Sequence, residues 1–142
     1  QTADSYHSLG VTQHSLGDFV SALESNKRAL NIRLKVLGEE HSQTADSYHS
    51  LGVTQHSLGD FVSALESKKR ALNIRLKVLG EEHSETADSY DSLGVTQHSL
   101  GDFVSALQSA KCALDIRMKM HGEEDPRTVN SLATVKELQK LL

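Results

Sequence analysis

Residues 1–42 read QTADSYHSLGVTQHSLGDFVSALESNKRALNIRLKVLGEEHS, and this segment determines the fold because two close copies follow it in the chain. Residues 43–84 are the same sequence with Lys68 in place of Asn26. Residues 85–126 form a third copy with scattered changes, and residues 127–142 begin a fourth. A fixed period of this size is typical of proteins in which one small structural unit stacks on its neighbours.

Each copy carries the pattern of two helices. In the first copy, Gly17 and Asp18 suit the end of a helix over residues 1–16 and the N-cap of a second helix over residues 19–37. The apolar arc of the second helix is too broad for one neighbour, so we expect it to pack between its own first helix and the next copy. The inward stripe of the first helix is predicted, from helical spacing, to consist of Tyr6, Leu9, Gln13 and Leu16.

The segment Arg127–Leu142 predicts a helix that closes the array. Asp125 and Pro126, just before it, combine an N-cap with a first-turn proline. Lys136 stands where the earlier copies have Gly, so a further second helix could not pack closely there. Stacked repeats need such a solvated end. The stripe expected to cover the preceding helix, around Leu114 and Met118, consists of Leu132, Val135, Leu138 and Leu142.

The first copy resembles the signature of tetratricopeptide repeats, in which large residues face small ones. The segment Ala29–His41 is similar to the 42-residue variety found in kinesin light chains. The resemblance implies an all-α, right-handed superhelical solenoid of antiparallel helix pairs. It would contain repeats at 1–42, 43–84 and 85–126 and a capping helix at 127–142. The residues that carry the signature are Tyr6, Leu9, Gly10, Gly17, Phe19, Ala22 and Ala29.

Composition excludes several other classes. The formal net charge of −4 gives no basic excess for nucleic acid. No apolar run approaches the ~20 residues needed to cross a bilayer, so we expect no membrane association. The lone Cys112 cannot form an internal disulfide, and no glycosylation sequon is present, which favours the cytoplasm. The chain starts without Met or a signal-like segment, and we expect it to be a piece of a longer protein.

No catalytic template is present, which predicts that the chain is not an enzyme and has no cofactor. Ser, His and Asp recur in every copy, whereas an active site is one asymmetric, desolvated arrangement. A metal site built from His and Asp is disfavoured because equivalent side chains of neighbouring repeats would lie too far apart. We assign no binding role to His121, or to His41 and His83, which we expect to start the next helix.

One stripe of the first helix is the candidate binding surface. By the resemblance, this face lines a concave groove that binds an extended peptide or a partner segment, while a merely solvated polar face is the alternative. Stacked copies would place equivalent residues in ladders along the groove. The candidate residues are Asp4, His7, Ser8, Val11 and His14, then Asp46, His49, Ser50, Val53 and His56, then Asp88, Asp91, Ser92, Val95 and His98.

The candidate groove has a charge that depends on pH. We expect Asp4, Asp46, Asp88 and Asp91 to make it mildly acidic at neutral pH, and its histidines to reverse the sign on acidification. A structural spacer or self-associating array without a dedicated ligand remains the rival function. The first helix exposes the surface that a preceding repeat would cover, which predicts self-association through the N-terminal repeat.

Overall fold

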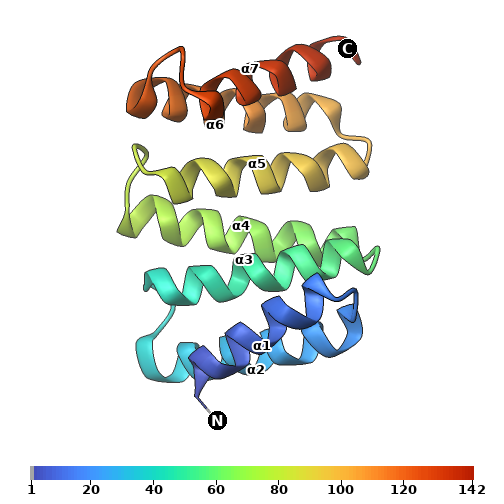
Figure 1. Ribbon diagram of the computed structural model, residues 1–142, viewed down its shortest axis with the longest axis vertical. Coiled ribbons are helices and arrows are strands. Elements are labelled where there is room, and N and C mark those ends of the chain that lie inside the picture. Colours follow the sequence, from blue (N-terminus) through green and yellow to red (C-terminus); the bar gives the residue numbers. More distant parts are fainter. Residues whose placement is uncertain (1) are drawn as a thin grey trace. The chain divides into compact units, whose positions relative to one another are not determined.

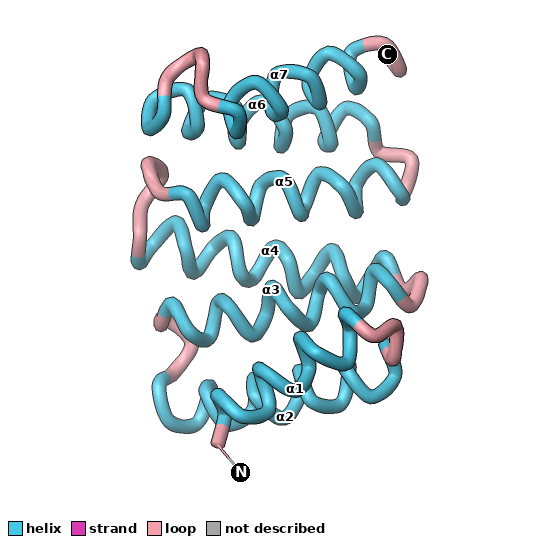
Figure 2. Tube along the Cα trace, viewed as in Figure 1, coloured by secondary structure: helices cyan, strands magenta, loops and turns pink. Residues whose placement is uncertain are grey.

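A computed structural model describes residues 2–142, which are helical apart from short turns (Figures 1 and 2). The chain divides into two compact units, Gln1–Val78 and Leu79–Leu142. The first unit contains α1 (Ala3–Ser15), α2 (Phe19–Leu37), α3 (Ser42–Ser57) and α4 (Phe61–Val78). The second contains α5 (Ser84–Ser99), α6 (Phe103–His121) and α7 (Pro126–Gln139). The described residues thus confirm the predicted all-α fold of helix pairs.

The helix ends follow the local chemistry that the sequence predicts. Gly17 and Gly38 have φ of 81° and 83°, which favours glycine and ends α1 and α2. The carboxylate of Asp18 accepts the backbone N–H of Ser21 at 3.2 Å and caps α2. His41 has the predicted role of starting a helix, since its Nδ1 accepts the N–H of Gln43 at 3.0 Å.

The core of the first unit lies where α3 packs on both α2 and α4. Gly52 lets α3 approach α4 closely: a Cβ built there would lie 3.3 Å from the carbonyl oxygen of Ala64 and 2.7 Å from Cγ of Lys68. Gly52 and the backbone of Ala64 are therefore in close contact. The buried side chains of this core are Leu30, Ala45, Tyr48, Leu51, Ala71 and Ile74.

The predicted inward stripe of the first helix is wrong at its C-terminal end. Leu16 is 79% exposed because it is the C-cap residue of α1 and lies at the turn into α2, beyond the last packed helical turn. Its equivalents Leu58 and Leu100 are C-caps too and are also exposed. Leu9 is exposed as well, whereas Leu51 and Leu93 at the equivalent positions are buried.

The second unit is built on α6, which packs against both α5 and α7. Asp125 and Pro126 start α7 as predicted, with the Asp125 carboxylate accepting the N–H of Arg127 at 2.9 Å. The core combines residues of α6 and α7: Ala106, Leu107, Ala110, Leu114, Val135 and Leu138.

Only part of the predicted covering stripe of α7 packs in this core. Val135 and Leu138 are buried there, as predicted, beside Leu114. Leu142 is exposed because it lies beyond the end of α7, and Leu132 and Met118 are also exposed. The predicted cover is therefore confirmed at Val135 and Leu138, which form the packed edge of α7.

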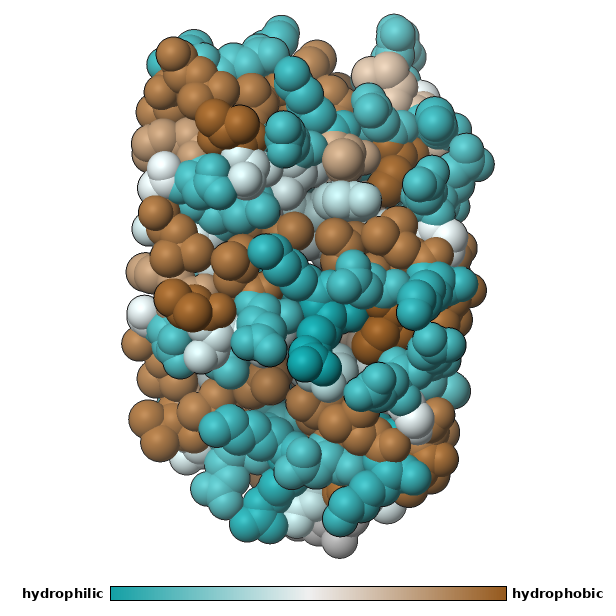
Figure 3. Space-filling model, turned by 180° about the vertical axis from the view of Figure 1, so that it is seen from behind, coloured by the Kyte–Doolittle hydropathy of each residue, from teal (hydrophilic) through white to brown (hydrophobic). Residues whose placement is uncertain are grey.

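Hydrophobic side chains also reach the surface. Val20, Val36 and Val62 on the second helices of their copies are each more than two-thirds exposed. On the face drawn in Figure 3, hydrophobic surface forms several patches divided by hydrophilic residues. No helix among the described residues is long and apolar enough to cross a membrane.

Candidate functional site

The fifteen candidate residues all lie on α1, α3 and α5, and none is fully buried. Two depressions, one in each unit, gather eight of them. The depression in the first unit is lined by Val11, His14, His49, Ser50 and Val53, and that in the second by Asp91, Val95 and His98. The candidate residues that line neither depression are Asp4, His7, Ser8, Asp46, His56, Asp88 and Ser92.

The depression of the first unit has a volume of about 220 Å³ and lies between α1 and α3. Its floor is polar: Thr54 Oγ1 donates a hydrogen bond of 2.7 Å to Asn26 Oδ1, and both side chains are buried. At its edge, His14 Nε2 and Ser57 Oγ are hydrogen-bonded at 2.9 Å, which joins α1 to α3. Hydrogen bonds therefore close the depression at its floor and join its two walls at one edge.

The depression of the second unit is larger, about 760 Å³, and lies between α5 and α7 above α6. No Cα atom of α5 lies within 8 Å of a Cα atom of α7, whereas α1 and α3 do approach this closely. Its floor contains Ala106 and Ala110 of α6, and its rim carries the carboxylates of Asp91 and Glu137. We call it the α5–α7 pocket.

An arginine that was not predicted from the sequence lies beside the candidate stripe. Arg33 belongs to α2, yet its side chain is only 6% exposed. Its Nη1 donates to Ser47 Oγ at 2.9 Å and to the carbonyl oxygen of Gln43 at 3.1 Å. Its Nη2 donates to Asp4 Oδ1 at 3.1 Å. One guanidinium thus joins the first helix of its own copy to the first helix of the next.

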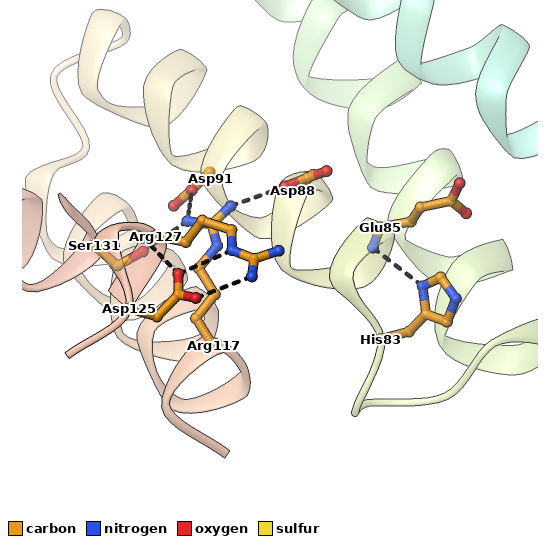
Figure 4. Close-up of polar contacts among 8 residues, drawn as sticks. All are labelled: His83, Glu85, Asp88, Asp91, Arg117, Asp125, Arg127 and Ser131. Carbon is orange, nitrogen blue, oxygen red and sulfur yellow. Dashed lines mark hydrogen bonds and ion pairs between the residues drawn. The ribbon is translucent and has the colours of Figure 1, made fainter. Parts of the chain in front are cut away.

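The same arrangement recurs in the third copy, where one arginine binds two carboxylates (Figure 4). Arg117 Nη2 donates to Asp88 Oδ1 at 2.9 Å, and Nη1 donates to Asp91 and to Ser131 Oγ of α7. In the second copy, Arg75 Nη2 lies 3.0 Å from Asp46 Oδ1. The sequence contains a signal for these arginines, because each follows Ile inside the apolar run of its second helix.

The predicted acidic excess is wrong for the first two copies. Asp4 and Asp46 each have an arginine partner, so their charges are compensated. In the third copy Asp88 and Asp91 share Arg117, which leaves one carboxylate in excess. Burial raises the pKa of Asp91, although the hydrogen bond from Arg117 opposes this. The acidic character is thus confined to the third copy.

The predicted reversal of charge on acidification is also weaker than expected. Burial, assisted by the positive charge of Arg33, lowers the pKa of His7 below its usual value. Burial and then Lys68 likewise lower the pKa of His56. The rings of His14, His56 and His98 contact the rings of Phe19, Phe61 and Phe103 at centroid distances of 4.9, 4.8 and 5.2 Å.

The described residues were also compared with the needs of a metal ion. Across residues 2–142, no three side chains of His, Cys, Asp or Glu are grouped closely enough to hold an ion. Asp4 and Asp46 each bind a guanidinium group, which is suited to recognising a carboxylate.

Comparison with known protein families identifies the repeat. A family model described as a tetratricopeptide repeat matches residues 1–77 and 62–119, which together cover most of the chain. The chain therefore belongs to the tetratricopeptide repeat family. Repeats of this family generally mediate protein–protein interactions, and their helical fold is typically that of a non-catalytic scaffold. No curated protein sequence matches the chain.

Solved structures show the same fold. BtubC (BKLC) from P. vanneervenii is similar over 97% of this chain and 55% of its own, with a TM-score of 0.90 and 26% identity. A putative kinesin light chain of Podosopora anserina with nearly identical TPR-like repeats is similar over 96% of this chain and 65% of its own, with a TM-score of 0.88 and 23% identity. The apo form of RapI is similar over 98% of this chain and 48% of its own, with a TM-score of 0.84 and 19% identity. The chain spans about half to two thirds of these proteins.

Proposed function

We propose that this chain is a protein-interaction module that binds an extended peptide or partner segment along the first helices of its repeats. The proposal takes residues 1–42, 43–84 and 85–126 as the repeats and residues 127–142 as a capping helix. It assigns the module no catalysis, no cofactor, no nucleic acid, no membrane and a cytoplasmic location. The coarser statement, a role in protein interaction, follows from the family.

The observation that carries the finer proposal is that both depressions lie on the first helices and combine polar with apolar walls. In the first unit, Ser50 and His49 offer a hydroxyl and an imidazole beside Val11 and Val53. An extended peptide presents unpaired backbone N–H and C=O groups, so it needs such partners along its length. Apolar contacts between them would then hold its side chains.

Selection of peptides on the immobilised chain tests the proposal. A displayed library of random peptides is selected on the 142-residue chain, and the dissociation constants of selected peptides are measured by calorimetry. The double variant His49→Ala/Val53→Ala should weaken binding, because it removes one polar and one apolar wall of the depression. Lys69→Ala, on the exposed side of α4, is the control and should leave affinity unchanged. Thermal melting must show that both variants remain folded.

The rival function gives a different result. A spacer or self-associating array would yield no peptide whose binding depends on His49 or Val53. Self-association rests on α1, where Leu9 and Leu16 are exposed and could be covered by a second copy. Sedimentation over a range of concentrations tests self-association. A dimer fraction that grows with concentration and is abolished by Leu9→Ser supports it. A monomer at every concentration contradicts it.

A further inference from the structure

We propose that the α5–α7 pocket is a specificity subsite that accepts a bulky apolar side chain of a bound peptide next to a lysine or arginine. This inference rests on the proposed function, since it names the side chains that the groove would select. It depends on features of the third copy that the first two copies lack.

The floor of the α5–α7 pocket consists of small residues. Ala110 stands where the first two copies have Asn26 and Lys68. Beside it, a Cβ built on Gly94 would meet no atom closer than 3.4 Å, whereas one built on Gly10 would lie 2.6 Å from the Asn26 amide. The larger side chains of the earlier copies thus fill the space that is empty above Ala110.

The opposite wall is also altered. Leu138 of α7 stands where α3 has Thr54, and Ala133 stands where α3 has His49. The hydrogen bond from Thr54 to Asn26 that closes the first depression has no counterpart here, because Ala110 and Leu138 are apolar and pack together. The result is a pocket more than three times larger, about 760 against 220 Å³. A volume of this order accommodates a large aliphatic or aromatic side chain.

The charge of the pocket determines which peptide residue is favoured next to the apolar side chain. Its lining residues include the carboxylates of Asp91 and Glu137 and no lysine or arginine. Arg117 is shared between Asp88 and Asp91, so it compensates only one of them. Lys140 contacts Glu137 at 3.1 Å, but both side chains are more than 70% exposed, and such surface pairs exchange readily with a competing cation. A basic residue of the peptide would therefore be favoured at this rim.

Two variants reduce the pocket from opposite walls. Ala110→Met places an unbranched apolar side chain above α6, and Ala133→Met does so from the exposed face of α7. The probes are synthetic peptides derived from one selected binder, with Leu, Phe or Ser at the central position and Arg, Ala or Glu beside it. Each methionine variant should weaken binding of the Leu and Phe peptides by about tenfold or more and leave the Ser peptide little changed.

The charge is tested separately. Glu137→Gln should reduce the preference for Arg over Glu beside the apolar residue by several-fold, with the difference vanishing at high salt. Gln108→Glu is the matched control: it restores the residue of the first two copies at an exposed position on α6 and should change neither preference. Circular dichroism melting excludes misfolding, and Ala133→Met keeps the test valid where Ala110→Met is unstable.

The outcomes separate the subsite from the proposed function. Peptides that bind with affinities indifferent to both methionine variants but sensitive to His49→Ala/Val53→Ala would contradict the subsite alone. If peptides with Glu beside the apolar residue bind more tightly than those with Arg, the proposed preference of the pocket rim for a basic residue is contradicted. A failure to select any peptide would overturn the proposed function and this inference together.

Discussion

Nη1 of Arg33 on α2 donates a hydrogen bond of 2.9 Å to Oγ of Ser47 on α3, and thereby joins one sequence copy to the next. The Ser47 side chain is buried, and so is the guanidinium apart from a small fraction of its surface. The same guanidinium reaches the carbonyl oxygen of Gln43 and the carboxylate of Asp4. Its partners differ sharply in exposure, which determines how much each contributes to stability.

We expect Arg33→Met to lower the free energy of unfolding by about 1–3 kcal/mol, because Ser47 and the Gln43 carbonyl lose their buried donor. Asp4→Asn should cost less than about 0.5 kcal/mol, since the Asp4 side chain is 79% exposed. Urea unfolding measures both, and Arg28→Met on the exposed side of α2 serves as the control. A larger loss for Asp4→Asn than for Arg33→Met would show that the ion pair, not the buried hydrogen bonds, dominates.

Gly52 and Gly94 are equivalent in sequence but differ in the space around them. A Cβ at Gly52 lies 2.7 Å from Lys68 Cγ, whereas the nearest atom at Gly94 is 3.4 Å away. Gly52→Leu should therefore overpack α3 against α4 and destabilise the chain by ~1–3 kcal/mol or more. Gly94→Ala is expected to be neutral or to stabilise by up to ~1 kcal/mol through helix propensity. Denaturant midpoints compare them, and an unchanged midpoint for Gly52→Leu would contradict the packing described.

The contact of α7 with α6 depends on Leu138, which is buried beside Leu114, while Leu142 is exposed. We expect Leu138→Ala to cost about 2–4 kcal/mol and Leu142→Ala to cost almost nothing. Deletion of residues 127–142 should uncover the apolar side of α6 and promote aggregation. Light scattering and thermal melting measure both effects. If the chain without residues 127–142 stays monomeric and equally stable, α7 does not cover the apolar side of α6.

The helices were predictable from the sequence because the repeat displays its caps and glycines three times over. The enclosure of Arg33 was missed although the residue follows Ile inside an apolar run, because a run of this kind predicts burial of its apolar members, and only the packing shows that Arg33 is enclosed while Arg28 is solvated. The exposed Leu16 was misplaced for a related reason: helical spacing continues through a C-cap although the backbone does not. The width of the α5–α7 pocket depends on how far two helices stand apart, which no local pattern encodes.

Burial of Lys68 predicts a pH dependence of stability. Its pKa is lowered to about 8 by burial, below its value in the unfolded chain. Between these two values the unfolded chain binds more protons, so stability should rise with pH from about 8 to 10.4. The free energy of unfolding should rise by at most about 1.4 kcal/mol per pH unit. Over the whole range it should rise by up to roughly 3 kcal/mol. Unfolding at several pH values measures it, and Lys68→Asn, the residue of the first copy, should remove the slope. A slope that persists in this variant would assign it to other groups.

NMR mapping of a selected peptide on the isotopically labelled chain shows whether a partner segment binds along the first helices. We expect backbone shifts to change on titration around His49 to Val53 of α3 and around Asp91 to Val95 of α5. The exposed sides of α2 and α6, for example near Val20 and Val104, should stay unchanged. Shift changes confined to those exposed sides, with α3 and α5 unaffected, would contradict it.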